Sequence, residues 1–234
     1  MITPENTFHS SRYLLHSEKR IEHLNSIGLP ITKDMTVLEV GAGIGDHTKY
    51  FIDIGCDIVT TEGRQENVAL LNKYVGDRAK VELLDLENPS PNLIYDKEFD
   101  IVYCYGTLYH LSNPGLALNY LSKKCKGMFL LETCVSFGNN KVVNNIKEIV
   151  RDPSQSLSGT GCRPTRTWLY DKMKSLFQYV YLTKTQPDHC EFPTNWLVPS
   201  KQQSSRVVMF GSRFPIENKL LLESLPNQQE RFRK

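Results

Sequence analysis

Residues 37–48 have the sequence Val-Leu-Glu-Val-Gly-Ala-Gly-Ile-Gly-Asp-His-Thr. The apolar segment at 36–40 predicts a short strand, and helical spacing of apolar residues follows to about Ile54. The glycines at 41, 43 and 45 therefore fall in a turn between strand and helix. Such a turn lets a ligand approach the backbone closely and presents amide N–H groups to it. We therefore predict a ligand-binding turn within an α/β domain.

Strands and helices alternate on the C-terminal side of this turn. Further strands are predicted at 57–62, 80–84, 99–105 and 128–135, with helices at 65–75 and 114–124. Strands separated by helices predict parallel βαβ units with helices on both faces of the sheet. A helix is also predicted at 11–27, where Ser10 or Ser11 provides the N-cap and Gly28 and Pro30 end it.

The second half of the chain has a different pattern. Apolar residues at 142, 143, 146, 149 and 150 predict an amphipathic helix over 141–152, and Pro164 is expected to open a helix to about Phe177. The small, polar segment 154–161 is expected to form a mobile lid over the acceptor. Strands are predicted at 178–184 and 205–213. No crossover helix separates them, so we expect this pair to be antiparallel.

The charge and cysteine content exclude several classes of protein. A net charge of +2 over 234 residues is too small to indicate a polyanion-binding groove, so no nucleic-acid partner is expected. None of the six cysteines lies in a C-x-x-C pair, which predicts reduced thiols in a cytoplasmic protein. The N-terminal segment lacks the apolar core of a signal peptide, and no apolar run approaches the roughly 20 residues of a membrane span.

The glycine spacing argues against a dinucleotide. The sequence is G-x-G-x-G, and Asp46 stands where the third glycine of a G-x-G-x-x-G fingerprint is expected. Its carboxylate would repel a pyrophosphate, and Glu39 also suits a cationic ligand. Glu62 ends the second predicted strand, where a carboxylate accepts both ribose hydroxyls, and Asp85 follows the third, where it accepts from an adenine amino group. These strand ends face one crevice, which predicts a nucleoside site; the alternative is that both acids are ordinary turn residues.

Residues 36–134 resemble the class I S-adenosylmethionine-dependent methyltransferases. This resemblance rests on the first motif at 37–45, the acid Glu62 and the pair Asp85-Leu86. Residues 99–114 are similar to a subgroup with the motif L-Y-H-L, here 108–111. The motifs G-C-R-P-T-R at 161–166 and Q-P-x-H-x-x-F-P at 186–193 resemble uncharacterised bacterial methyltransferases often associated with cell-surface polysaccharide loci.

The resemblance implies a Rossmann-like, doubly wound sheet of seven strands in the order 3-2-1-4-5-7-6, with strand 7 antiparallel. We predict one domain over 1–234: an N-terminal helical cap (1–30), a cofactor-binding core (31–135) and an acceptor-side lid with terminal strands (136–234). The implied cofactor is S-adenosylmethionine. The residues expected to bind it are Glu39, Gly41, Ala42, Gly43, Gly45, His47, Thr48, Glu62, Gly63, Arg64, Asp85, Leu86 and Tyr105.

His110 is the predicted catalytic base. It follows the fourth strand at the crevice edge, and an ordinary histidine pKa suits proton removal from a hydroxyl. The alternative is that His110 caps a helix or bonds a backbone carbonyl. The residues expected to bind the acceptor are Arg12, Tyr13, His16, Tyr109, Arg163, Arg166, Trp168, His189 and Trp196. A structural lid, in which these arginines pair with core carboxylates, remains an alternative.

No metal is expected. His9, His16 and His23 recur every seven residues, a separation of about 10.5 Å along a helix. The predicted function is methyl transfer to a small acceptor, an O-methylation of a sugar or glycan-related hydroxyl. N-methylation of a small metabolite and a non-catalytic, cofactor-binding regulatory protein remain alternatives. The acceptor, the methylated atom and the oligomeric state are left open.

Overall fold

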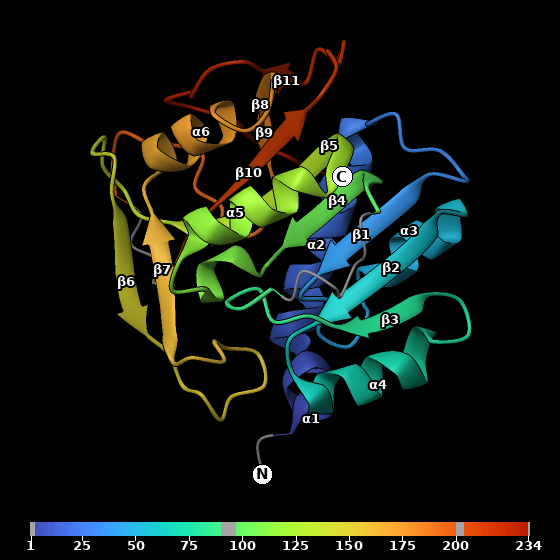
Figure 1. The fold of residues 1–234 in the computed structure, drawn as a ribbon. Helices are drawn as coiled ribbons and strands as arrows, with labels where there is room; N and C mark the ends of the chain where they lie inside the picture. The colour runs from blue at the N-terminus through green and yellow to red at the C-terminus, as the bar shows by residue number, and fades with distance from the viewer. Residues whose placement is uncertain (1–2, 90–96, 200–203, 234) are drawn as a thin grey trace.

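The centre of the protein is a large mixed sheet (Figure 1). The computed structural model describes residues 3–89, 97–199 and 204–233. Within these residues the sheet has eight strands in the order β11-β8-β10-β5-β4-β1-β2-β3. Their bounds are β1 Thr36–Val40, β2 Asp57–Glu62, β3 Lys80–Leu83, β4 Phe99–Tyr105, β5 Cys125–Val135, β8 Tyr179–Thr183, β10 Ser205–Ser212 and β11 Leu221–Leu222.

The predicted strand order is confirmed. β1 pairs in parallel with β2 and β4, β2 with β3, and β4 with β5. β10, the predicted seventh strand, lies between β5 and β8 and is antiparallel to both. The two-residue strand β11 extends the edge beyond β8 and was not predicted. Because β1, β2 and β4 are parallel, their carboxyl ends share one edge of the sheet, where the glycine turn begins.

Helices cover both faces of the sheet. The α-helices are α1 Pro4–Phe8, α2 Ser11–Ile27, α3 Thr48–Ile54, α4 Gln65–Val75, α5 Pro114–Lys123 and α6 Arg166–Lys174. α5 and α6 share one apolar cluster with alternate residues of β1 and β10, including Leu38 and Met209. α2 and α3 share the opposite cluster with the intervening residues, including Val37 and Phe210. The alternation of buried side chains along each strand therefore builds two cores.

The helix predicted over 141–152 is wrong. Residues Val143–Lys147 form strand β6, which pairs antiparallel with β7, Thr160–Pro164. Figure 1 shows this hairpin standing apart from the central sheet. The side chains of Val142, Ile149 and Val150 are 41–54% exposed, so the expected apolar helix face has no core to cover. The β-branched Val143 and Ile146 suit a strand and the two asparagines are weak helix formers, so the segment pairs with β7 instead of forming a helix.

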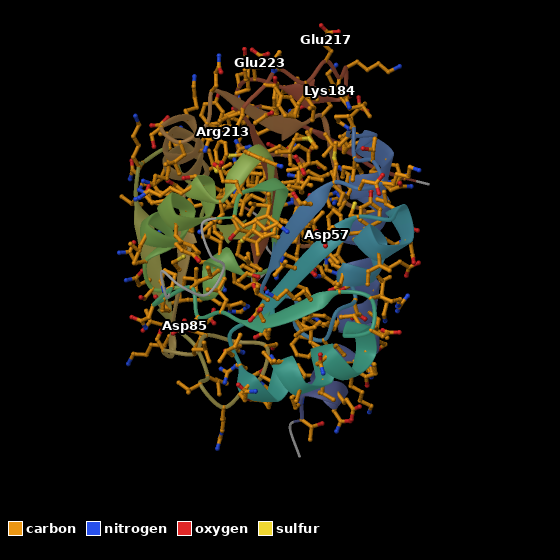
Figure 2. All side chains as sticks on the ribbon, turned by 45° about the vertical axis from the view of Figure 1, so that its right-hand side comes forward. Asp57, Asp85, Lys184, Arg213, Glu217 and Glu223 are labelled. Carbon is orange, nitrogen blue, oxygen red and sulfur yellow. The ribbon has the colours of Figure 1, made fainter. Side chains whose placement is uncertain are left out.

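The helix expected from Pro164 begins two residues later. Pro164 ends β7, and the Thr165 side chain caps α6 by accepting a hydrogen bond from the Trp168 amide. The C-terminal segment returns along the sheet edge, where β12 (Glu230–Arg231) pairs with β9 (Thr185–Gln186). In Figure 2, Lys184 and Glu217 of this part lie at the opposite end of the molecule from Asp85. None of the described helices has the length and apolar character needed to cross a membrane.

Candidate functional site

The glycine turn joins β1 to α3 at the carboxyl edge of the sheet. Gly41 and Gly43 have φ angles of 67° and 60°, in the left-handed region that favours glycine. A Cβ atom on Gly41 would lie 2.1 Å from the Thr107 hydroxyl oxygen, so a side chain is also excluded by packing. The Gly43 amide donates to Glu62 Oε2 at 2.9 Å. The shape of the turn is therefore set by the left-handed conformation of its glycines and by the acid at the end of β2.

Glu39 fastens the elements around this turn. It is buried in β1, and its Oε2 atom accepts hydrogen bonds from the hydroxyls of Thr48 (2.5 Å) and Thr60 (2.8 Å). Burial raises the pKa of Glu39 to about 7, although the two hydroxyl donors act in the opposite direction. Gly45 packs against Leu71 of α4, and Thr48 is buried on Glu39. Of the predicted cofactor residues, Gly45 and Thr48 thus support the turn and do not line the cavities.

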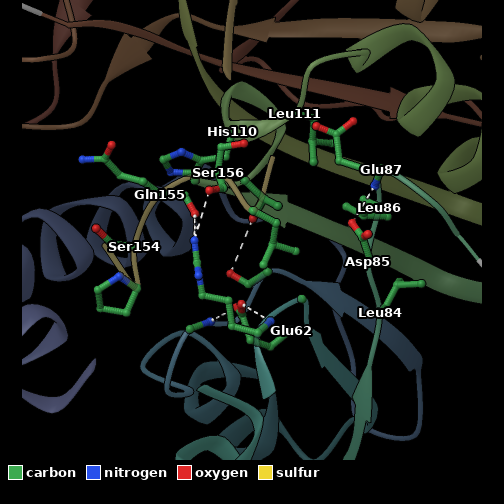
Figure 3. Close-up of a pocket in the computed structure, with 18 of the residues that line it drawn as sticks. Glu62, Leu84, Asp85, Leu86, Glu87, His110, Leu111, Ser154, Gln155 and Ser156 are labelled. Atoms are coloured by element: carbon green, nitrogen blue, oxygen red, sulfur yellow. Dashed lines mark hydrogen bonds between the residues drawn. The ribbon is translucent and has the colours of Figure 1, made fainter. Parts of the chain in front are cut away.

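A first cavity lies between the glycine turn and the ends of β2 and β3 (Figure 3). Glu62 Oε1 accepts from the Arg64 amide at 3.2 Å and from Asn67 Nδ2 at 3.3 Å. Burial raises the pKa of Glu62, and the hydrogen bonds that it accepts lower it in part. Asp85 accepts from the Glu87 amide at 2.9 Å. The predicted cofactor residues that line this cavity are Gly41, Gly43, Glu62, Gly63, Arg64, Asp85 and Leu86.

Segment 153–157 covers this cavity on the side opposite Glu62 (Figure 3). Arg64, predicted to meet the cofactor, donates through Nη2 to the carbonyl oxygens of Val150 (2.7 Å), Gln155 (3.0 Å) and Ser156 (3.0 Å). Asn67 Nδ2 donates to the Pro153 carbonyl at 2.9 Å. Two side chains near the start of α4 therefore hold the predicted lid in a closed position. Its mobility stays a prediction.

A second, smaller cavity adjoins the glycine turn and is lined by Glu39, Gly41, Ala42, His47, Tyr105, Arg20 and Asp46, among others. Four buried atoms of its lining residues have no hydrogen-bond partner within the described chain: Arg20 Nε, Asp46 Oδ2, His47 Nε2 and Tyr105 Oη. Buried polar groups without partners are costly, so these atoms mark a place for a ligand. A guanidinium and a carboxylate suit the carboxylate and ammonium of an amino acid. They fit the methionine part of S-adenosylmethionine.

Sequence reasoning missed Arg20 and used Asp46 only to exclude a dinucleotide. A signal for Arg20 was present, because Arg12, His16 and Arg20 follow at intervals of four on one face of α2. Arg20 is 4% exposed and donates through Nη1 to Glu132 Oε2 at 3.1 Å. That contact orients the arginine toward the glycine turn, where Gly106 leaves room for its guanidinium.

His110 lies where the first cavity meets a third, larger one. It ends a short 3₁₀ helix, Leu108–His110, directly after β4. Its Nδ1 atom is 2.5 Å from Glu148 Oε2, which also accepts from the Ser156 amide at 2.8 Å. Burial lowers the pKa of His110, and Glu148 opposes that shift; the pKa of Glu148 is itself lowered because its hydrogen bonds and the nearby charges outweigh burial. The pair therefore combines a neutral imidazole at pH 7 with an anionic carboxylate.

Glu148 was not predicted as a site residue. Position 148 is not among the apolar positions of the helix predicted over 141–152, and nothing in the pattern marked it as a site residue. It follows β6 instead, and the β6–β7 hairpin brings it to His110, 38 positions earlier in the chain. Only the pairing of that hairpin connects the two residues.

The third cavity has a volume of about 530 Å³, within the size range of small-molecule pockets. It shares Tyr13, Gly106, His110, Ser154 and Gln155 with the first cavity. Six of the predicted acceptor residues line it: Arg12, Tyr13, His16, Tyr109, Arg163 and His189. The structure thus brings together residues from α2, the turn after β4, β7 and the loop before β10.

Three predicted acceptor residues lie elsewhere. The Arg166 guanidinium stacks 3.9 Å over the Trp196 ring and donates to the Pro226 carbonyl at 3.0 Å. Trp196 Nε1 donates to Gln229 Oε1 at 2.7 Å. Trp168 packs against the apolar cluster of α5 and α6. None of the three lines the described cavities, and Arg166 and Trp196 instead bind the C-terminal segment.

His16, His189 and Glu191 form a group whose ligand atoms lie within 4.8 Å of one another. Glu191 already accepts hydrogen bonds from Arg206 Nε at 2.7 Å and Arg12 Nη2 at 3.1 Å. The two guanidiniums neutralise the charge of Glu191, the only carboxylate of the group, and repel a metal cation. The absence of a metal here stays a prediction, supported by this electrostatic argument.

Comparison with known proteins finds methyltransferases with the same fold. A family profile described as a methyltransferase domain matches residues 14–195. The N-terminal domain of EvdMO1, crystallised with SAH bound, is 18% identical with a TM-score of 0.63, covering 84% of this chain and 80% of that one. The 1,6-didemethyltoxoflavin-N1-methyltransferase of Burkholderia thailandensis, with S-adenosylhomocysteine, is 17% identical with a TM-score of 0.53, covering 84% and 75%. No curated protein sequence matches the chain.

Proposed function

The chain belongs to the family of S-adenosylmethionine-dependent methyltransferases, and from this premise we propose that it methylates a hydroxyl of a small, sugar-related acceptor. The observation that carries the proposal is the His110–Glu148 pair, which lies between the cofactor cavities and the large third cavity. A hydroxyl must lose a proton to become a good nucleophile, whereas a neutral amine attacks without a base. A base that is held by a carboxylate therefore favours O-methylation over N-methylation.

The residues of the site fall into three groups, which bind the cofactor, remove the acceptor proton and exclude water. When bound, S-adenosylmethionine supplies an already activated methyl group. Glu62 and Asp85 would hold its nucleoside, while Arg20, Asp46 and the glycine turn would hold its amino-acid end. His110 Nε2 accepts the acceptor proton, and the Glu148 carboxylate stabilises the imidazolium that forms while fixing Nδ1 as the protonated nitrogen. The Arg64-bound segment 153–157 excludes water from the first cavity.

The nature of the acceptor is supported by the third cavity and by one structural relative. Tyr13, Tyr109 and several arginines line the cavity, and such residues suit sugar-like molecules. The EvdMO1 domain has also been crystallised in the presence of SAH and D-fucose.

All six cysteines are free thiols, which suits the proposed cytoplasmic location. Screening sugars and nucleotide sugars for release of S-adenosylhomocysteine tests the proposal, and exclusive transfer to amines would refute the hydroxyl acceptor.

Glu62→Ala is expected to weaken S-adenosylhomocysteine binding by about 1.5–3 kcal/mol, the range for hydrogen bonds to charged groups. Calorimetry measures this affinity directly, and NAD is expected not to bind the wild-type protein. Glu217→Ala, on an exposed side chain at the opposite end of the molecule from Asp85 (Figure 2), is the matched control and retains affinity. Equal affinity in Glu62→Ala and wild type would show that Glu62 only supports the glycine turn.

Glu148→Gln is expected to change both the rate and the pH profile. The carboxylate raises the pKa of His110, so its removal lowers that pKa further, and the acidic fall in kcat/KM moves to lower pH. The plateau rate falls by about 10–100-fold, because the imidazolium loses a charged partner worth about 1.5–3 kcal/mol. A merely structural Glu148 would lower the rate without moving the acidic limb, and that result would contradict its positioning role.

A further inference from the structure

The wall of the third cavity is strongly cationic. Among the described residues, Arg12, Arg20, Lys147, Arg163 and Arg206 line it. They come from α2, from the β6–β7 hairpin and from the start of β10, three parts of the chain far apart in sequence. Five cationic side chains from separate elements meet at one cavity. This arrangement is typical of a ligand-binding site and not of an ordinary solvated surface.

The carboxylates of the same wall are already neutralised. Glu148 contacts His110 and lies 3.7 Å from Arg163, while Glu191 is bound by Arg12 and Arg206. A third carboxylate, Glu132, lies beneath the cavity between Arg20 and Arg206. Five cations and three carboxylates leave two positive charges in excess. Lys147 has no ion pair within the described chain and is exposed at the cavity edge.

Arg163 is the cation best placed for a ligand beside His110. Its Nη1 atom donates to the carbonyl oxygens of Tyr109 (3.2 Å) and Cys162 (2.7 Å), which fixes the guanidinium next to the 3₁₀ helix that carries His110. The side chain keeps 20% of its surface exposed to the cavity. His16, which lines the same cavity, is buried, and its Nε2 atom has no hydrogen-bond partner within the described chain. Burial and neighbouring arginines lower the pKa of His16, so it is neutral.

We propose that the acceptor carries an anionic group, a carboxylate or a phosphoryl group, which Arg163 and Lys147 bind while the reacting hydroxyl lies at His110. This inference rests on the proposed function and narrows its substrate class. A neutral His16 beside the same cavity then offers a hydrogen bond to a further polar group of the acceptor. A neutral sugar would leave two excess positive charges uncompensated in a partly buried cavity, where charges interact more strongly than in water.

Calorimetry on the protein loaded with S-adenosylhomocysteine tests the proposal, with D-glucose, D-glucuronate and D-glucose 6-phosphate as probes. At least one charged probe is expected to bind on the order of tenfold or more tightly than D-glucose, a ratio that corresponds to about 1.4 kcal/mol. The two charged probes distinguish a carboxylate site from a phosphoryl site. Raising the ionic strength is expected to weaken the charged probes and leave D-glucose unchanged.

Variants locate the anion site. Lys147→Glu and Arg163→Gln are each expected to weaken binding of the charged probe about tenfold. Arg163→Lys is expected to weaken this binding less than Arg163→Gln does. Lys123→Gln, on an exposed side chain at the end of α5, is the matched control. Three results would overturn the anionic acceptor. The charged and neutral probes could bind equally well, neither charged probe could bind at millimolar concentration, or both variants could bind the charged probe as tightly as wild type. Failure of S-adenosylhomocysteine to bind wild type would instead contradict the proposed function.

Discussion

His110→Gln is expected to lower the turnover of a hydroxyl acceptor by roughly 10²–10⁴-fold, the usual loss when a general base is removed. Burial lowers the pKa of His110, so the wild-type imidazole is neutral at pH 7 and ready to accept a proton. The wild-type kcat/KM is therefore expected to be flat near pH 7 and to fall only at lower pH, as His110 becomes protonated. Release of S-adenosylhomocysteine, followed against pH, measures both effects.

The affinity for S-adenosylhomocysteine is the internal control for this variant. His110 contacts Glu148 and lies at the far side of the first cavity from Glu62 (Figure 3), so the binding constant is expected to stay near that of wild type. Turnover near the wild-type rate would make His110 a structural residue and place the base elsewhere. The next candidates are Tyr13, His16 and His189, which line the third cavity together with His110. Burial raises the pKa of Tyr13, so its hydroxyl stays protonated at pH 7 and is the least available of the three to accept a proton.

Glu132→Ala is expected to lower the free energy of unfolding by about 3–5 kcal/mol, the cost of leaving buried charges without their partner. Glu132 is fully buried in β5 and binds Arg20 at 3.1 Å and Arg206 at 3.0 Å. Arg206 retains Glu191 in the variant, whereas Arg20 loses the only carboxylate that it pairs with among the described residues. The excess of positive charge beside the second cavity is therefore the main source of instability.

Urea unfolding of the ligand-free protein measures this loss by linear extrapolation. Lys126→Ala removes an exposed ion pair with Asp100 at the other end of the same strand and is expected to cost only about 0–1 kcal/mol. A loss in Glu132→Ala as small as in this control would mean that the two guanidiniums find other partners or water. S-adenosylhomocysteine binding is expected to weaken as well, because Glu132 holds Arg20 beside the glycine turn.

The sequence alone predicted the parallel core because its signals are local. The apolar strand 36–40, the glycines that follow and the helix to Ile54 lie within twenty residues, and their periodicities differ. The predicted bounds of β1, β2 and α4 agree with the structure because each element buries one continuous pattern of side chains. The positions of Glu62 and Asp85 follow directly, since the carboxyl ends of parallel strands share one edge.

Contacts between distant segments were decided only by the tertiary structure. The apolar spacing at 141–152 fits a helix, but pairing with β7 makes it a strand because no core lies beneath the helix face. That pairing alone brings Glu148 to His110, and the packing of α2 against β5 and β10 alone brings Arg20, Glu132 and Arg206 together. Spacing along a chain predicts which face a residue occupies. It does not specify which distant charge will neutralise it, because that depends on how the elements pack.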